Sequence, residues 1–125
     1  MKTVLVLGAG RVSGPCIDYL VRKTNCKVVV ADISSENLTK TAKRFPSVET
    51  IESDVAKSAG EIMDRYHPEL VINLMPSFLM TPVTRLCLDR GIHMVHPSYL
   101  GKETKAMDEE CQKRGLIFIT ELGLD

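Results

Sequence analysis

Short apolar runs alternate with longer amphipathic segments along the chain, at intervals of roughly 20 to 25 residues. This alternation is typical of strands that are joined by crossover helices. Four of the runs consist almost wholly of Val, Ile and Leu, as in strands that helices cover on both faces of a parallel sheet. We expect strands at Thr3–Leu7, Lys27–Asp32, Val48–Ile51, Leu70–Leu74, Ile92–His96 and Leu116–Ile119.

The segments between these runs carry the signals of helices. In the first, which spans residues 11–22, Val12, Cys16 and Leu20 fall on one apolar stripe. Helix starts and stops follow from residue type: serine and threonine cap, proline opens or stops a helix, and glycine follows its end. The expected signals are Ser34 or Ser35 and then Pro46 for the second helix, Thr81–Pro82 and then Gly91 for the fourth, and Gly115 after a fifth within 102–114.

Six strands with right-handed helical crossovers predict an α/β fold, a Rossmann-type doubly wound parallel sheet with the strand order 3-2-1-4-5-6. The chain reverses its direction along the sheet after the third strand. A ligand is therefore expected at the carboxyl ends of strands one and four. The 125 residues are enough for one domain, residues 1–125, and too few for two ordinary ones.

Composition excludes several classes of partner. Sixteen Lys and Arg balance sixteen Asp and Glu, so no surplus positive charge is present to attract nucleic acid. No apolar run approaches the length of a membrane span, and the start lacks the features of a secretory signal. The four cysteines are scattered, without metal-ligand spacing. We expect a cytoplasmic chain with no membrane partner, no metal and no disulfide framework.

A glycine-rich turn, Gly8-Ala9-Gly10-Arg11-Val12-Ser13-Gly14, lies between the first strand and the first helix. Gly8 permits the tight turn, and Gly10 lets the backbone approach a pyrophosphate without a Cβ in the way. Free amides and the positive end of the helix dipole then hold the anion, with Arg11 and Val12 at the helix start. Ser13 replaces the third glycine of the usual fingerprint, and its small size preserves close helix–strand packing. The turn predicts binding of a dinucleotide.

Asp32 ends the second strand, where a carboxylate can accept hydrogen bonds from an adenosine ribose. Its charge would repel a 2′-phosphate, and positions 33–39, which begin with Ile33 beside the ribose, hold no Arg or Lys. NAD is therefore favoured over NADP as cofactor. NADP stays possible because Arg11 could reach either phosphate. A second interpretation of Asp32 is an acid that caps the helix after Ser34.

Two further pairs of residues are expected around the cofactor. Asp54 and Val55 follow the third strand, where the adenine edge would lie, although Asp54 fits a plain helix cap equally well. Met75 and Pro76 follow the fourth strand, where their backbone groups would contact the nicotinamide half. His96 ends the fifth strand on the ligand side, and simple packing is favoured there over a proton carrier. His67 is expected to face solvent at a helix end.

The carboxyl-terminal run Glu121-Leu-Gly-Leu-Asp125, together with residues 4–15, Leu74-Met-Pro76 and Ser98-Tyr99, closely resembles the amino-terminal domain of glutamate-forming saccharopine dehydrogenases. The resemblance implies an NAD- or NADP-dependent step of lysine metabolism, in which saccharopine is oxidised and hydrolysed to aminoadipate semialdehyde and glutamate. It places Ser98, Tyr99 and Asp125 at the saccharopine cleft, with Tyr99 and Asp125 as candidate catalytic residues. It gives no support to a catalytic role for His96.

The resemblance also implies that the chain is an excised cofactor domain of a longer, homodimeric enzyme. The family's large substrate and dimerisation domain, which follows the position of Asp125, is absent, so the parent activity is not expected in the chain alone. Three alternatives remain open: a related carboxynorspermidine dehydrogenase, a nucleotide-sensing module without chemistry, and a methyltransferase that binds S-adenosylmethionine in the same glycine turn.

Overall fold

The computed structural model describes residues 2–10, 13–76, 79–95 and 118–119. Strands and helices alternate along the chain, as the apolar runs predict. The strands are β1 (Thr3–Leu7), β2 (Lys27–Asp32), β3 (Glu49–Glu52), β4 (Leu70–Asn73), β5 (His93–Val95) and β6 (Phe118–Ile119). The helices are α1 (Ser13–Lys23), α2 (Ser35–Arg44), α3 (Val55–Tyr66) and α4 (Met80–Arg90).

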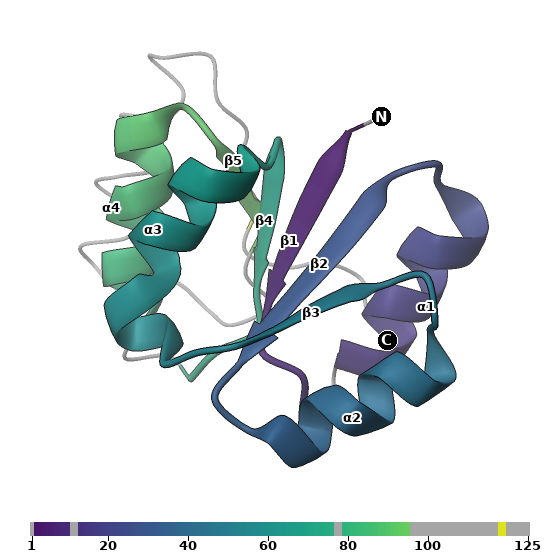
Figure 1. The fold of residues 1–125 in the computed structure, drawn as a ribbon. Coiled ribbons are helices and arrows are strands. Elements are labelled where there is room, and N and C mark those ends of the chain that lie inside the picture. Colours follow the sequence, from purple (N-terminus) through teal and green to yellow (C-terminus); the bar gives the residue numbers. More distant parts are fainter. Residues whose placement is uncertain (1, 11–12, 77–78, 96–117, 120–125) are drawn as a thin grey trace.

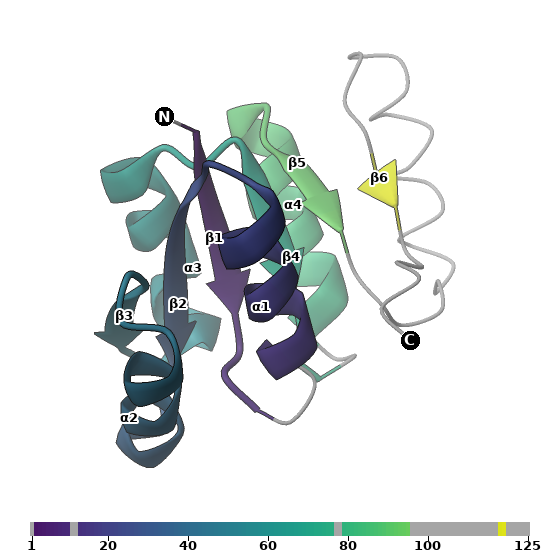
Figure 2. The same ribbon diagram turned by 90° about the vertical axis from the view of Figure 1, so that its right-hand side faces the viewer.

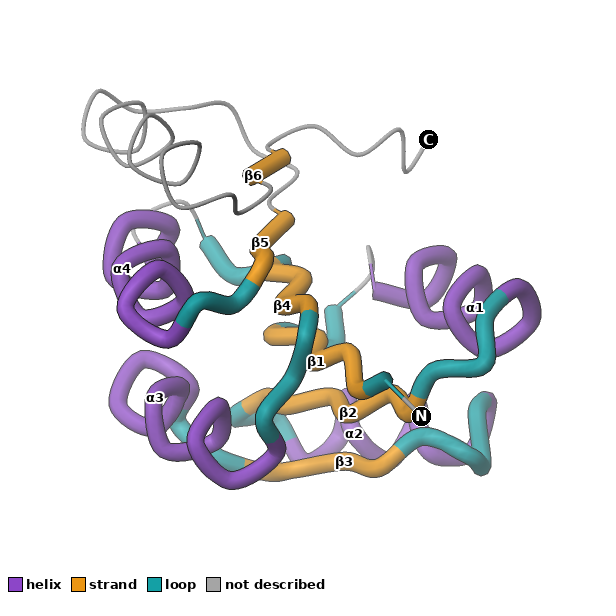
Figure 3. The backbone as a smooth tube through the Cα atoms, turned by 90° about the horizontal axis from the view of Figure 1, so that it is seen from above, coloured by secondary structure: helices purple, strands orange, loops and turns teal. Residues whose placement is uncertain are grey.

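All strands pair in parallel in one sheet with the order β3-β2-β1-β4-β5-β6, which confirms the predicted Rossmann-type topology. Helices α1 and α2 cover one face of the sheet, and α3 and α4 cover the other (Figure 1). The same two layers are seen from above in Figure 3. Figure 2 shows β5 beside α4, with β6 at the edge of the sheet. The chain turns back between β3 and β4, so β1 and β4 lie side by side at the switch point.

Two apolar layers hold the helices to the sheet. One contains side chains of β1, β2 and β4 with those of α3 and α4, among them Leu5, Met63 and Cys87. The other joins the opposite face of the same strands to α1 and α2, through residues such as Ile17 and Leu38. Central strands that face apolar helices on both sides must be apolar on both sides, which accounts for their unbroken Val, Ile and Leu.

Most of the helix limits agree with the expected signals. The Ser34 hydroxyl accepts a hydrogen bond from the Asn37 amide as the cap of α2, and that helix ends at Arg44, before Pro46. Gly91 ends α4 with a φ of 67°, in the left-handed region. The fifth helix expected within 102–114, and Gly115 after it, lie outside the described residues.

Several expected limits were wrong. Strand β4 ends at Asn73 and not at Leu74, and β5 begins at His93 and not at Ile92. Thr81 does not cap α4: the helix begins at Met80 after Leu79, whose amide donates to the Pro76 carbonyl and starts the turn earlier. Pro82 still falls in the first turn, where an absent amide hydrogen costs no helical bond. Strand β3 begins at Glu49 and not at Val48, because the Val48 amide donates to the Phe45 carbonyl in the turn after α2.

No helix among the described residues has the length and apolarity that a membrane crossing requires.

Truncation of Ile17 to alanine tests the packing of α1 on the sheet. Ile17 is 0% exposed in the layer between α1 and the strands. We expect Ile17→Ala to lower the free energy of unfolding in urea by about 2–5 kcal/mol, because it removes buried apolar contacts and leaves a cavity. Tyr19→Ala on the same helix is the matched control, since Tyr19 is 60% exposed and its loss should change stability by less than about 0.5 kcal/mol. Equal losses would contradict the packing described.

Candidate functional site

Gly8 lies where the carboxyl ends of three strands meet. Its amide donates to the Ala31 carbonyl of β2 at 2.8 Å, and the neighbouring Leu74 amide donates to the Leu7 carbonyl at 2.9 Å. The backbone of Gly8 has a φ of 110°, and a Cβ there would stand 3.4 Å from backbone atoms of Leu74. A side chain there is therefore strained by the backbone conformation and would contact Leu74, just after β4, which agrees with the predicted role of Gly8 in the tight turn.

Gly10 is a glycine for a different reason. Its φ is not positive, and apart from its chain neighbours no heavy atom of the described residues lies within 4 Å of the position that a Cβ would occupy. The hydroxyl of Ser13 donates to the Gly10 carbonyl at 2.6 Å, and the Ser13 amide donates to the same oxygen at 3.1 Å. The loop is therefore anchored to the first turn of α1, while the face of Gly10 is open. This open space beside a helix start fits a pyrophosphate, which needs close approach to the backbone.

The carboxylate of Asp32 joins the glycine loop to the start of α2. Its Oδ2 accepts a hydrogen bond from the Ala9 amide at 2.6 Å, and its Oδ1 accepts one from the Ser34 amide at 2.8 Å. Asp32 is only 9% exposed. The cap of α2 is Ser34 itself, so Asp32 does not cap the helix, and its carboxylate instead holds the amide of the cap residue. This contact does not use up the carboxylate, because each oxygen can accept more than one hydrogen bond.

A hollow of about 240 Å³ lies between the glycine loop and α2. Two cations on α2, Lys40 and Arg44, line it, and the Arg44 guanidinium stands 2.8 Å from the position of a Cβ on Gly14. No cation at these positions was predicted to lie at the site. Lys40 and Arg44 nevertheless follow Asn37 at i+3 and i+7, so both lie on the same face of α2 as Asn37. The lining residues are Ala9, Gly10, Ser13, Gly14, Asn37, Lys40, Thr41, Arg44 and Phe45.

The other predicted cofactor contacts lie at the same edge of the sheet. Asp54 caps α3, with its Oδ1 accepting from the Ala56 amide at 3.2 Å, and the side chain of Val55 is buried in the apolar layer. Ile33 is 64% exposed beside Asp32. Met75 is half-buried and Pro76 is exposed, directly after β4. The structure therefore places these residues around the carboxyl ends of the strands, while a contact of Asp54 or Val55 with adenine stays a prediction.

Several predicted residues lie outside the described part of the chain, so the structure places none of them. They are the cofactor candidates Arg11 and Val12, the substrate candidates Ser98, Tyr99 and Asp125, and His96.

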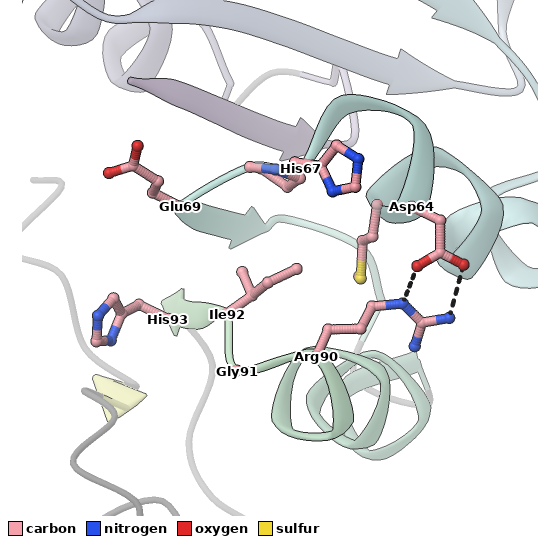
Figure 4. Close-up of a pocket in the computed structure, with 9 residues that line it drawn as sticks. Asp64, His67, Glu69, Arg90, Gly91, Ile92 and His93 are labelled. Atoms are coloured by element: carbon pink, nitrogen blue, oxygen red, sulfur yellow. Dashed lines mark hydrogen bonds and ion pairs between the residues drawn. The ribbon is translucent and has the colours of Figure 1, made fainter. Parts of the chain in front are cut away.

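A second hollow, of about 440 Å³, lies at the opposite, amino edge of the sheet, before β4 and β5 (Figure 4). Asp64 and Arg90 form a two-pronged ion pair there, with Nε–Oδ1 and Nη2–Oδ2 distances of 2.8 and 3.2 Å. Glu69 pairs with Lys2 at 3.7 Å. His67 is exposed at the end of α3, as expected. The carboxylates of this hollow are matched by cations, and it lies far along the strands from the glycine loop.

The described cysteines do not form a reactive or metal-binding group. Cys16 and Cys87 are buried and Cys26 is half-buried. Burial raises the pKa of the Cys16 thiol to about 11, so it stays protonated at neutral pH. Within the ranges that the structure describes, no three His, Cys, Asp or Glu residues are arranged to hold a metal ion.

The chain is similar to known proteins over almost its whole length. Residues 4–119 match the model of the saccharopine dehydrogenase NADP binding domain family. The chain is 32% identical to alpha-aminoadipic semialdehyde synthase of Rattus norvegicus, over 99% of this chain and 13% of that protein. It is 26% identical to the saccharopine dehydrogenase [NADP(+), L-glutamate-forming] of Schizosaccharomyces pombe, over 100% of this chain and 28% of that protein.

A solved structure of the same kind shows the same fold. The apo saccharopine dehydrogenase (L-Glu forming) of Saccharomyces cerevisiae superposes with a TM-score of 0.82 at 27% identity, covering 98% of this chain and 27% of that one. This chain therefore spans about an eighth to about a quarter of the relatives that it matches.

The two loop glycines predict opposite behaviour on substitution by alanine. Gly10→Ala adds a methyl group to open space, so we expect a change of less than about 1 kcal/mol in the free energy of unfolding. The same methyl group stands where a pyrophosphate would approach, and NADH affinity should fall by about tenfold or more, measured by the fluorescence of bound NADH.

Gly8→Ala is the companion variant. We expect it to lower the free energy of unfolding by about 1–3 kcal/mol, because alanine is strained at the positive φ of this position. If Gly10→Ala binds NADH as tightly as the wild type, the pyrophosphate does not bind at the glycine loop.

Proposed function

The chain belongs to the saccharopine dehydrogenase NADP binding domain family, and we propose on that basis that it is the cofactor-binding part of an enzyme that oxidises saccharopine at its C–N bond. The observation that carries the proposal is the glycine loop, with open space at Gly10 and the carboxylate of Asp32 bound to the loop amide of Ala9. Together they form a cradle for a pyrophosphate and an adenosine ribose.

The residues of the chain would divide the work of holding the dinucleotide. The amides of Gly8 and Ala9 are already bonded to β2, so the amides of the following residues, Gly10 to Val12, hold the pyrophosphate at the start of α1. Asp32 accepts from the hydroxyls of the adenosine ribose. The backbone of Met75 and Pro76 contacts the nicotinamide half beyond β4. A bound nicotinamide would supply the acceptor for a hydride from the carbon beside the secondary amine of saccharopine.

We further propose that water attacks the resulting imine of the substrate, which gives aminoadipate semialdehyde and glutamate. Tyr99 and Asp125 are our candidates for the groups that hold and move protons in this step, with Ser98 beside them, by their positions in the family's motifs. Exclusion of water until the imine forms needs a second domain that closes over the cofactor. The chain alone is therefore expected to bind the dinucleotide without turning over saccharopine.

Binding of the dinucleotide is tested by stability. NADH at a hundred times its dissociation constant should raise the free energy of unfolding by roughly 2.7 kcal/mol. S-adenosylmethionine is the control ligand, because a methyltransferase would use the same turn, and no stabilisation is expected from it. Stabilisation by S-adenosylmethionine alone would overturn the proposal.

The substrate is tested in a full-length protein that contains this sequence. We expect saccharopine to drive the reduction of NAD+ or NADP+, followed by the absorbance of the reduced nicotinamide. If carboxynorspermidine drives the reduction of the nicotinamide and saccharopine does not, the substrate of the enzyme is carboxynorspermidine and not saccharopine. Tight binding of NADH without oxidation of either amine would favour a nucleotide-sensing module.

We propose NAD as the preferred cofactor of this chain. The Asp32 carboxylate suits the two hydroxyls of an unmodified ribose and repels a 2′-phosphate. Ile33, the next residue, is exposed and carries no charge. Lys40 and Arg44 are the described cations that line the hollow beside the loop, and they are the groups on which binding of NADP would depend.

Paired titrations with NADH and NADPH test this preference. The wild type should bind NADH at least about tenfold more tightly, a free-energy difference of about 1.4 kcal/mol. Asp32→Ala should reduce that ratio by a similar factor. The ratio is the readout, because Asp32 also holds the Ala9 amide and its loss will weaken both ligands.

Glu52→Ala is the matched control for Asp32→Ala. Glu52 pairs with Asp32 in the register of β2 and β3, and it is exposed. Its removal takes away a charge of the same sign one strand further from the loop, so the NADH to NADPH ratio should stay within about twofold of the wild type. An unchanged ratio in Asp32→Ala would contradict the preference for NAD.

A further inference from the structure

Asn73 is a fully buried polar residue at the switch point of the sheet. It is the last residue of β4, it is 0% exposed, and it pairs in register with Leu7 of β1. The next residue, Leu74, is the one that lies against Gly8. Asn73 therefore lies on β4 beside Leu7, the last residue of β1 before the glycine loop. No role was predicted for it.

The two ends of the Asn73 amide are in different situations. Its Oδ1 accepts a hydrogen bond from the Met75 amide at 3.1 Å. Its Nδ2 has no hydrogen-bond partner in the part of the chain that the structure describes. Exchange of the two atoms would set the amine of Asn73 against the Met75 N–H, donor against donor, so the contact with Met75 fixes which end is unpaired.

The fold alone does not explain an amide at this position. A buried donor without an acceptor costs about 1–3 kcal/mol. Side chains on the same face, Leu7 and Val71, belong to the apolar layer, so leucine would fill this place without that cost. The turn to Met75 requires only the acceptor oxygen. The donor nitrogen forms no hydrogen bond within the described residues, so the turn does not account for it.

We propose that Asn73 is a cofactor-binding residue, whose Nδ2 donates to an acceptor oxygen on the nicotinamide half of the bound dinucleotide. This rests on the proposed function. The strand order places Asp32 of β2 and Asn73 of β4 on opposite sides of β1. A dinucleotide whose pyrophosphate lies at the loop after β1 and whose adenosine lies at Asp32 carries its other half toward β4.

The side-chain amide of Asn73 is covered. Leu74 and Met75, which follow it, are half-buried, so we expect their side chains to shift when the nicotinamide half arrives. The hydrogen bond from the Met75 amide keeps the donor end of Asn73 in place before the ligand binds.

The direct test is the side-chain amide resonance of Asn73 in an ¹⁵N-labelled chain. NADH should shift this resonance, whereas ADP, which lacks the nicotinamide half, should leave it unchanged. The resonance is assigned by its loss in Asn73→Leu, or in Asn73→Asp if the leucine variant does not fold. Asn25, in the turn before β2 at the amino edge of the sheet, is the internal control and should respond to neither ligand.

Affinities provide the second measurement. Asn73→Leu should weaken NADH about tenfold and change the affinity for ADP by less than about twofold. Thr84→Val is the matched control. It removes a buried hydroxyl on α4 that donates to Met94 Sδ of β5, away from the carboxyl edge of the sheet, and should leave both affinities unchanged.

Three results would overturn the proposal. In the first, the Asn73 resonance does not respond to NADH. In the second, it responds equally to ADP. In the third, both ligands lose affinity equally in Asn73→Leu, since Asn73 would then act on the loop. A wild-type chain that binds neither NADH nor ADP would instead refute the proposed function, and this inference would fall with it.

Discussion

The hydrogen bond from the Ala9 amide to the Asp32 carboxylate is the contact on which the rest of the site depends. It ties the loop after β1 to the end of β2, and the same carboxylate holds the first free amide before α2. The positive φ of Gly8 turns the chain at that point, where a side chain would be strained and would contact Leu74. The start of the loop, Gly8 to Gly10, is therefore held by bonds within the chain, and such pre-organisation lowers the entropic cost of holding an anion.

The two edges of the sheet satisfy their charges in different ways. At the amino edge, side chains pair with one another: Glu49 accepts a hydrogen bond from the Tyr66 hydroxyl, which lowers the pKa of Glu49, and Lys27 lies 3.4 Å from it. At the carboxyl edge, Asp32 is satisfied by backbone amides and keeps further capacity to accept hydrogen bonds. The donor of Asn73, which has no partner among the described residues, lies at this same edge. Free hydrogen-bonding capacity of both kinds is therefore found on the side where a parallel sheet takes its ligands.

Membership of the family and the choice of cofactor depend on different residues. The family match covers residues 4–119, a range that includes the described sheet and the glycine loop. The choice between NAD and NADP depends on a few side chains around one ribose hydroxyl. In this chain those positions hold an acid at Asp32 and an uncharged Ile33, while the cations Lys40 and Arg44 stand on the next helix. A family name that includes NADP is compatible with a member that prefers NAD.

The amino-acid sequence by itself determined the order of strands and helices, the topology and the glycine loop, because apolar periodicity and glycine act over short distances along the chain. It did not decide that Leu79 would open α4 or that Val48 would belong to a turn, since backbone hydrogen bonds to Pro76 and Phe45 set those limits. Only the tertiary structure brought the Asp32 carboxylate to the Ala9 amide and the Arg44 guanidinium close to Gly14. It also buried the Asn73 amide where the described residues offer its nitrogen no acceptor. Those contacts join residues from different strands and helices, and no local pattern records which of them meet.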